Sequence, residues 1–527
     1  MPRFLRNLKF RQGALAFAAV LGVCAAFWIG YGVSQAFGRV RLDTLKESYG
    51  RDEFVDVRLR TRDPGLRAQW TAQGVRIRVL REGLPVTGIG GLRELPLRWD
   101  SARGAWMGRW PCPWNPPLGR YSLELSEPLE SGKELRSRGF ELRARPLNPF
   151  PPRLAVVNWE SAKSLASLQV RAPDGTLKDW RGLLDWTEYA GADAFWMLGG
   201  QTPGSGSGEV WQTRNLKMIP EVARECHRRG LKFGVWVMYS LTVSSTNRIP
   251  GYEYALEIEE GRPKPTRAVS LRDERRLKDV AALLKRFAAI KEVDFLGVDY
   301  IRNALGGYEL AEEFRADMPW AFGASAGCER WSPEQRMADF ARRKIARKDA
   351  RLIDAWQWWR AHRVGRVLRE LRREIGPSKP LWAFTLTWQK GWHHGQDPVM
   401  FSDAGADACA LMMYEADSAQ YAQMIKDWHA YVRSADARLI TGDIVDWSLH
   451  QRAAAGPGEM RRRLDAAVDG IYADGPAAGI FIHDLDRALN GRLGRWSTRA
   501  WLDAARASIR RMKRLPPPSG TWKERTT

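Results

Sequence analysis

The sequence has little cysteine, and it lacks the motifs of several common chemistries. Its five cysteines include no Cys-x-x-Cys pair, so neither a zinc site nor a disulfide framework is indicated. The glycine-rich stretch 204–208 lacks the Lys-Ser/Thr of a phosphate-binding loop. Zinc fingers, RNP-like motifs and basic heptads are missing too. We therefore expect no cofactor, no metal and no nucleic-acid partner.

The chain does not lack length or positive charge. Its 527 residues are too many for one ordinary domain and predict about two to four. The net charge of +22 suggests contact with an anionic lipid surface or an acidic polysaccharide. The alternative is a solvated, arginine-rich surface without a specific partner.

One long apolar run is present, at residues 14–37, after a basic segment at residues 1–13. A bilayer-spanning helix needs about 20 residues, so the run predicts a transmembrane signal anchor. The flanking arginines and lysine keep residues 1–13 cytoplasmic and place the bulk of the chain in the periplasm, as a single-pass inner-membrane protein. Cleavage after Ser34-Gln35-Ala36, which would release a secreted form, is the alternative.

After an expected linker at 39–50, residues 51–146 show short alternating apolar runs separated by turn residues. This spacing predicts an all-β, immunoglobulin-like sandwich that serves as an accessory domain. Trp106, Trp110 and Trp114 allow two interpretations. They are either core residues of a spacer domain, which we favour, or a carbohydrate-binding surface.

A proline-rich linker at 146–152 ends this domain. From 153 to 509, apolar strands alternate with amphipathic helices, which predicts an α/β fold, a (β/α)8 TIM barrel. The expected strands are 154–160, 192–199, 231–239, 294–302, 381–388, 406–415, 438–446 and 479–487. A doubly wound open sheet is the alternative. Residues 510–527 predict a disordered basic tail.

The fourth strand carries a resemblance to a known family. Its sequence V-D-F-L-G-V-D-Y-I-R resembles the D-G-I-H-L-D-Y-I-R strand of bacterial glycoside-hydrolase-like (β/α)8 families. The matching residues are Asp294, Asp299, Tyr300, Ile301 and Arg302, whereas Phe295 and Gly297 replace the glycine and histidine of the family. The resemblance implies a hydrolase, a glycosidase of carbohydrate metabolism.

The working residues of such a barrel stand at the carboxyl ends of its strands. Glycosidic cleavage needs two carboxylates. By analogy with retaining barrel enzymes, we predict Asp299 as nucleophile and Glu415 as acid/base, with Arg302 keeping Asp299 ionised. Glu160, Asp443 and Asp484 compete with Glu415 for the second role. The mixture of aromatic and polar strand ends favours sugar binding, and the predicted substrate-binding residues are Trp159, Glu160, Trp196, Tyr239, Tyr300, Arg302, Trp388, His393, Tyr414, Asp443, His483 and Asp484.

The sequence thus predicts a glycoside hydrolase of an extracellular or cell-envelope polysaccharide, with an acidic polymer favoured by the positive charge. One alternative is a catalytically silent barrel that binds polysaccharide. Another is a structural component of an envelope or export complex.

Overall fold

The computed structural model describes residues 39–129, 134–204, 208–242, 248–302, 306–322, 330–386, 394–414, 417–432, 436–446, 456–472, 475, 477–491 and 495–516. Contacts divide the chain into two compact units. The first holds Phe54–Pro111 and Leu118–Leu142 together with the chain up to Tyr49, and the second holds Gly50–Glu53, Cys112–Pro117 and everything from Arg143 onward.

The first unit is built from short strands with alternating buried and exposed side chains. Its elements are β1 (Arg39–Thr44), β2 (Ser48–Tyr49), β3 (Phe54–Thr61), α2 (Pro64–Gln73), β4 (Val75–Arg81), β5 (Leu84–Pro85), β6 (Leu95–Asp100), β7 (Ala105–Pro111), β8 (Gly119–Leu125), β9 (Glu134–Ser137) and β10 (Phe140–Leu142). The pairings form one path, β2-β10-β8-β4-β6-β7-β3-β1-β9, with β5 on β4. The unit is therefore mainly β, with helix α2 after β3, whereas its immunoglobulin-like, two-sheet arrangement stays a prediction.

Two features of this unit differ from the sequence expectations. Residues 39–44, expected as a linker, form strand β1, because Val40 and Leu42 are apolar at alternate positions and both are fully buried. Trp106 and Trp110 are 2% and 1% exposed, so they belong to the core, as the spacer interpretation predicts. Trp114 instead belongs to the second unit, where its indole nitrogen donates to Asp354 at 2.7 Å.

The second unit contains the predicted barrel. Its eight parallel strands are β11 (Leu154–Trp159), β14 (Ala194–Thr202), β15 (Lys232–Thr242), β18 (Phe295–Asp299), β19 (Leu381–Leu386), β20 (Ala408–Met412), β21 (Leu439–Ile444) and β22 (Ala477–His483). They pair in the order β14-β11-β22-β21-β20-β19-β18-β15, and β14 also pairs with β15, which closes the ring. The (β/α)8 architecture is thereby confirmed, and the open-sheet alternative is excluded.

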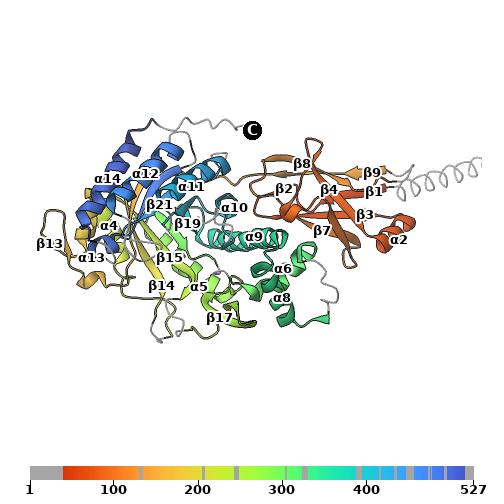
Figure 1. Cartoon of the computed structure of the whole chain (residues 1–527), viewed down its shortest axis with the longest axis horizontal. Helices are drawn as coiled ribbons and strands as arrows, with labels where there is room; N and C mark the ends of the chain where they lie inside the picture. The colour runs from red at the N-terminus through yellow and green to blue at the C-terminus, as the bar shows by residue number, and fades with distance from the viewer. Residues whose placement is uncertain are drawn as a thin grey trace, which may run out of the picture. The chain divides into compact units, whose positions relative to one another are not determined.

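Helices follow the barrel strands and cover the outside of the barrel (Figure 1). They are α3 (Arg181–Tyr189), α4 (Ile219–Arg228), α5 (Glu274–Ala288), α9 (Ala350–Ile375), α10 (Pro398–Ala404), α11 (Ser418–Tyr431), α12 (Pro457–Ala467), α13 (Leu485–Asn490) and α14 (Thr498–Arg514). Side-chain caps fix several of their first turns. Asp273 accepts from Arg276 N at the start of α5, and Asp349 accepts from Leu352 N at the start of α9.

Shorter elements are inserted between these strands and helices. The small hairpin β12 (Val170–Arg171) and β13 (Leu177–Lys178) precedes α3. After β15 comes the hairpin β16 (Tyr254–Glu259) and β17 (Arg262–Val269). After β18 come α6 (Ala311–Asp317), α7 (Pro319–Phe322) and α8 (Pro333–Ile345). Figure 1 shows α6, α8 and β17 gathered beside α5 and α9.

Aromatic rings fill the interior of the barrel. Trp196 is fully buried, with its ring 4.3 Å from that of Trp382 and 5.9 Å from that of Phe295. Two strand positions facing it are glycines, Gly234 and Gly297, and a Cβ at either would meet the Trp196 ring. From the preceding linker, Phe150 packs against both Phe295 and Trp382. The barrel centre is therefore a packed core.

The two ends of the chain concern the predicted transmembrane anchor and the predicted basic tail. Residues 1–13 and the apolar run 14–37 lie outside the described residues, and every helix within those residues is too short or too polar to span a bilayer. Residues 510–514, expected as part of the basic tail, instead complete α14, because Met512 is buried beneath this last turn.

Candidate functional site

Polar side chains converge at the carboxyl ends of four barrel strands. Strand β11 leads to Glu160, and β18 ends in Asp299 and is followed by Tyr300 and Arg302. Tyr414 follows β20, and β22 ends in His483, followed by Asp484. All seven are residues that the sequence predicted for the site.

Asp299 is a buried acid of this group, with 6% of its surface exposed. Its Oδ1 accepts the Tyr300 N–H at 2.5 Å and lies 3.6 Å from Arg302 Nη1. Burial raises the pKa of Asp299, while Arg302 and the Tyr300 N–H lower it by less. Arg302 thus acts in the expected direction, toward the ionised carboxylate, but its effect on the Asp299 pKa is smaller than that of burial.

The pKa of Tyr414 reflects carboxyl groups that come from several strand ends. Burial raises its pKa well above the usual value, and Asp299, Glu160 and Asp484 raise it further. Burial also raises the pKa of Tyr300, followed by the charges of Asp299 and Glu160. Asp299 and Glu160 thus act on both phenol rings, and Asp484 acts on that of Tyr414.

His483 and its neighbours form the other half of the site. The imidazole stacks on the Tyr414 ring, with centroids 4.9 Å apart and planes 7° from parallel. Its Nε2 is 3.3 Å from Glu160 Oε2 and 3.7 Å from Asp484 Oδ2. Asp484 caps α13, where its Oδ1 accepts Arg487 N at 2.9 Å and its Oδ2 accepts Arg487 Nε at 3.1 Å. The Glu160 side chain is 25% exposed and that of Asp484 only 2%, so Glu160 is the more accessible carboxylate.

Four predicted substrate-binding residues lie elsewhere. Trp196 belongs to the barrel core. Trp159 lines a separate hollow of about 470 Å³ outside the strands, together with Lys163 and Asn490. Tyr239 is fully buried and its pKa is raised by burial, with Arg276, Asp273 and Arg363 of the surrounding helices as its charged neighbours. Asp443 forms a buried two-bond ion pair with Arg463 of α12. The side-chain alternation along each strand turns Trp159, Tyr239 and Asp443 toward the helices.

Three further predicted residues, Trp388, His393 and Glu415, lie outside the described residues. The structure also adds two residues to those predicted. Asn158 bridges His483 and Trp236, with Asn158 Nδ2 3.0 Å from His483 Nδ1 and Trp236 Nε1 2.9 Å from Asn158 Oδ1. For Asn158 the available sequence signal is a polar residue at an inward-facing position immediately before the end of β11.

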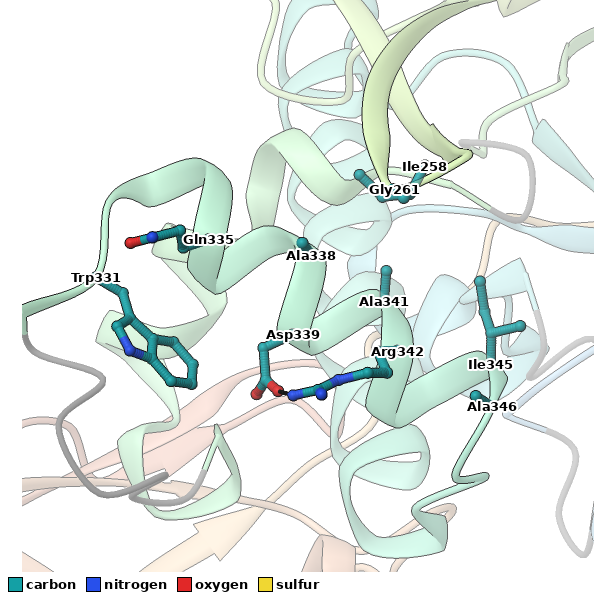
Figure 2. Close-up of a pocket in the computed structure, with 10 residues that line it drawn as sticks. All are labelled: Ile258, Gly261, Trp331, Gln335, Ala338, Asp339, Ala341, Arg342, Ile345 and Ala346. Carbon is teal, nitrogen blue, oxygen red and sulfur yellow. Dashed lines mark hydrogen bonds and ion pairs between the residues drawn. The ribbon is translucent and has the colours of Figure 1, made fainter.

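No group of three histidine, cysteine or acidic side chains in the described ranges could hold a metal ion. A hollow of about 590 Å³ lies between α8 and the β16–β17 hairpin, with Ile258 and Gly261 of the hairpin on one side and Trp331 at one end (Figure 2). Its described lining is mostly apolar, apart from Gln335 and the Asp339–Arg342 ion pair, and includes none of the strand-end residues.

No family model matches the chain, and no curated protein matches it in sequence. Solved structures similar to it include an alpha-galactosidase from Lactobacillus brevis (12% identity, TM-score 0.38, 69% of this chain and 40% of that chain). An Anoxybacillus alpha-amylase aligns over 69% of this chain and 79% of its own (11% identity, TM-score 0.38). A chitinase from Bacteroides thetaiotaomicron aligns over 69% and 99% (9% identity, TM-score 0.38). The chain spans less than half the length of the first. These similar structures are glycoside hydrolases, and the barrel assignment here rests on its own strand pairings.

Proposed function

We propose that this protein is a glycoside hydrolase that cleaves a polysaccharide at the strand ends of its barrel. The observation that carries the proposal is the convergence of Asp299, Glu160 and Asp484 around Tyr414. Glycosidic cleavage requires one protonated and one ionised carboxyl group. The carboxyl groups of this site differ in their burial, and such differences in environment allow one carboxyl group to be protonated while another is ionised.

Asp299 is one of the two working carboxyl groups in this proposal. The sequence prediction makes it the nucleophile, with Glu415 as acid/base. Because burial raises the pKa of Asp299, the structure favours a different role, in which Asp299 donates the proton to the leaving oxygen. The second carboxylate is then Glu415 or, among the described residues, Glu160.

The test compares Asp299→Asn with wild type on two substrate types, natural polysaccharides and aryl glycosides with acidic phenol leaving groups. A variant without its proton donor loses polysaccharide cleavage, by about 100-fold or more, but keeps cleavage of the activated aryl glycosides, which need no protonation. Loss on both substrates assigns Asp299 as nucleophile. Unchanged polysaccharide turnover would refute a catalytic role for Asp299.

A screen of acidic and neutral polysaccharides by reducing-sugar release identifies the substrate class. An acidic, extracytoplasmic polymer is proposed, because a chain of net charge +22 concentrates polyanions near its surface. Membrane anchoring through residues 14–37, with the barrel in the periplasm, belongs to the same proposal. Fractionation of cells expressing the full chain tests this placement.

The burial of Asp299 favours a second candidate, a catalytically silent barrel that binds polysaccharide within an envelope assembly. In that case the Asp299–Arg302 pair is structural. Equal binding by wild type and Asp299→Asn in affinity electrophoresis, with turnover by neither on the whole polysaccharide panel, supports this candidate over the enzyme.

A further inference from the structure

The hydrogen bonds around His483 determine where its proton sits. The indole Nε1 of Trp236 can only donate, so the Asn158 atom 2.9 Å from it must be the accepting oxygen, Oδ1. This contact fixes the orientation of the Asn158 amide, because a flipped amide would point its NH₂ group at another N–H.

The fixed amide presents its NH₂ group to His483 Nδ1 at 3.0 Å. An amide NH₂ has no acceptor capacity, so His483 Nδ1 must accept this hydrogen bond. A neutral imidazole with an accepting Nδ1 carries its single proton on Nε2. That nitrogen lies 3.3 Å from Glu160 Oε2, whereas Asp484 Oδ2 is farther away at 3.7 Å and already accepts from Arg487.

The ring plane is fixed as well as the tautomer. His483 stacks on Tyr414 at 7°, and the Phe481 ring lies 6.4 Å away at 14°. The imidazole therefore has one orientation, with one edge toward the barrel wall and the other toward Glu160.

We propose that His483 is a positioning residue, held neutral with its proton on Nε2, which orients Glu160 in the site by donating to its carboxylate. The inference deepens the proposed function and rests on it for its catalytic meaning. A donated hydrogen bond favours the ionised form of a carboxylate. Glu160 is then the charged partner that complements a protonated Asp299.

The arrangement resists the protonation of His483 despite its acidic surroundings. Among the described residues, the charged and titratable groups that face it include Glu160, Asp484 with its partner Arg487, and Tyr414, which Asp299 and Tyr300 also influence. The carboxylates favour an imidazolium. A second proton, however, would have to enter on Nδ1, directly against the Asn158 NH₂ group, and the repulsion between the two N–H groups opposes it.

The tautomer is measured by NMR of the full chain with ¹⁵N-labelled histidine, with the His483 signals assigned by their loss in His483→Gln. We expect a protonated Nε2 and an unprotonated Nδ1 throughout pH 6 to 8, a range in which an ordinary histidine titrates about its midpoint near 6.5. A protonated Nδ1 at pH 8, or an ordinary titration, would overturn the inference.

Asn158→Asp is the decisive variant. It replaces the NH₂ group with an acceptor oxygen, while the other oxygen still accepts from Trp236. We expect His483 to become doubly protonated at neutral pH, while the signals of His227, which faces Asp294, stay unchanged as the internal control. A His483 that remains neutral contradicts the proposal. If this variant fails to fold, Trp236→Phe frees the amide, and the Nδ1–H form should then appear.

Kinetics give the functional readout. His483→Leu removes the donor and should lower kcat about 10-fold or more, whereas His483→Gln, which can still present an N–H to Glu160, should retain most of it. Equal loss in both variants overturns the positioning role. If the wild type turns over no polysaccharide, the proposed function fails, and the NMR result still decides the tautomer independently.

Discussion

At the residue scale, burial decides the charge states of the site. Asp299 lies next to a cation, yet its pKa is raised, because the 3.6 Å separation from Arg302 compensates only part of the lost hydration. A carboxyl group in this environment holds its proton to higher pH than one in water, and this sets the expected pH dependence of catalysis.

Replacing Arg302 with methionine removes the cation that lowers the Asp299 pKa. If Asp299 is the proton donor, activity is lost as pH rises through its pKa, so the alkaline limb of the kcat/KM profile should move to higher pH in Arg302→Met. The pH–rate profiles of the two proteins measure this shift. Movement of the acidic limb instead would assign Asp299 to the ionised role.

Asp52 is a second residue with a raised pKa, and it should make the stability of the protein depend on pH. Burial raises its pKa to about 7, against partial compensation by Arg369. In the unfolded chain it titrates near 4, so the unfolded state loses its proton first. Stability therefore falls as pH rises from about 4 to about 7, by up to about 4 kcal/mol.

The measurement is the free energy of unfolding in denaturant at several pH values for wild type and Asp52→Asn. The variant should lose less stability over this range, and Glu124→Gln, at an exposed position of β8, should follow the wild type. Parallel pH dependence in wild type and Asp52→Asn would contradict the raised pKa.

At the element scale, two glycines make room for the aromatic core. Gly234 of β15 and Gly297 of β18 both face the Trp196 ring, and at Gly297 a Cβ would also lie 2.8 Å from Trp236 Cβ. Trp196 is enclosed by Phe295 and Trp382, so it has little freedom to move away. Strand positions without side chains are thus a packing requirement of this barrel.

Gly297→Ala should therefore destabilise the protein by about 1–3 kcal/mol through overpacking. Gly458→Ala, in the first turn of α12, where a Cβ meets only the far end of Arg462, is the matched control and should change stability little. Thermal unfolding of both variants distinguishes them. A Gly297→Ala protein as stable as the control would show that the core can rearrange.

The linker into the barrel depends on one buried acid, Asp407, which precedes β20. Its carboxylate accepts from Arg145 Nη2 at 3.0 Å, Asn148 N at 3.0 Å and Leu381 N at 2.9 Å, and it also pairs with Arg372. Asp407→Ala leaves two arginines without this partner and should cost about 3–5 kcal/mol. Limited proteolysis should then cut near residues 143–152, where the wild type is protected.

At the scale of the whole molecule, the excess positive charge should govern binding. Affinity for an acidic polysaccharide should fall steeply between about 0.05 M and about 0.5 M salt, because screening shortens the reach of surface charges. Affinity for a neutral polysaccharide should change little. Salt-independent binding of both polymers, measured by titration calorimetry, would show that the charge is not used in recognition.

The eight barrel strands could be predicted because each is a short, almost continuously apolar run between amphipathic helices, as in Phe295–Asp299. The sequence does not predict strand β1 of the first unit, because Val40 and Leu42 are its only apolar residues. The site could be predicted only in part. Trp159 and Asp443 are strand-end residues that face the helices, and the bond between Asn158 and His483 joins positions 325 residues apart in sequence.

The packed rings of Trp196, Trp382, Phe295 and Phe150 also determine from which end a ligand can enter the barrel. These side chains fill the centre of the barrel, so a ligand cannot pass through the barrel from one end to the other. A ligand of the strand-end residues must therefore enter and leave at the carboxyl ends of the strands. A long polymer would bind there across the end of the barrel or through one of its chain ends, and would not pass along the barrel axis.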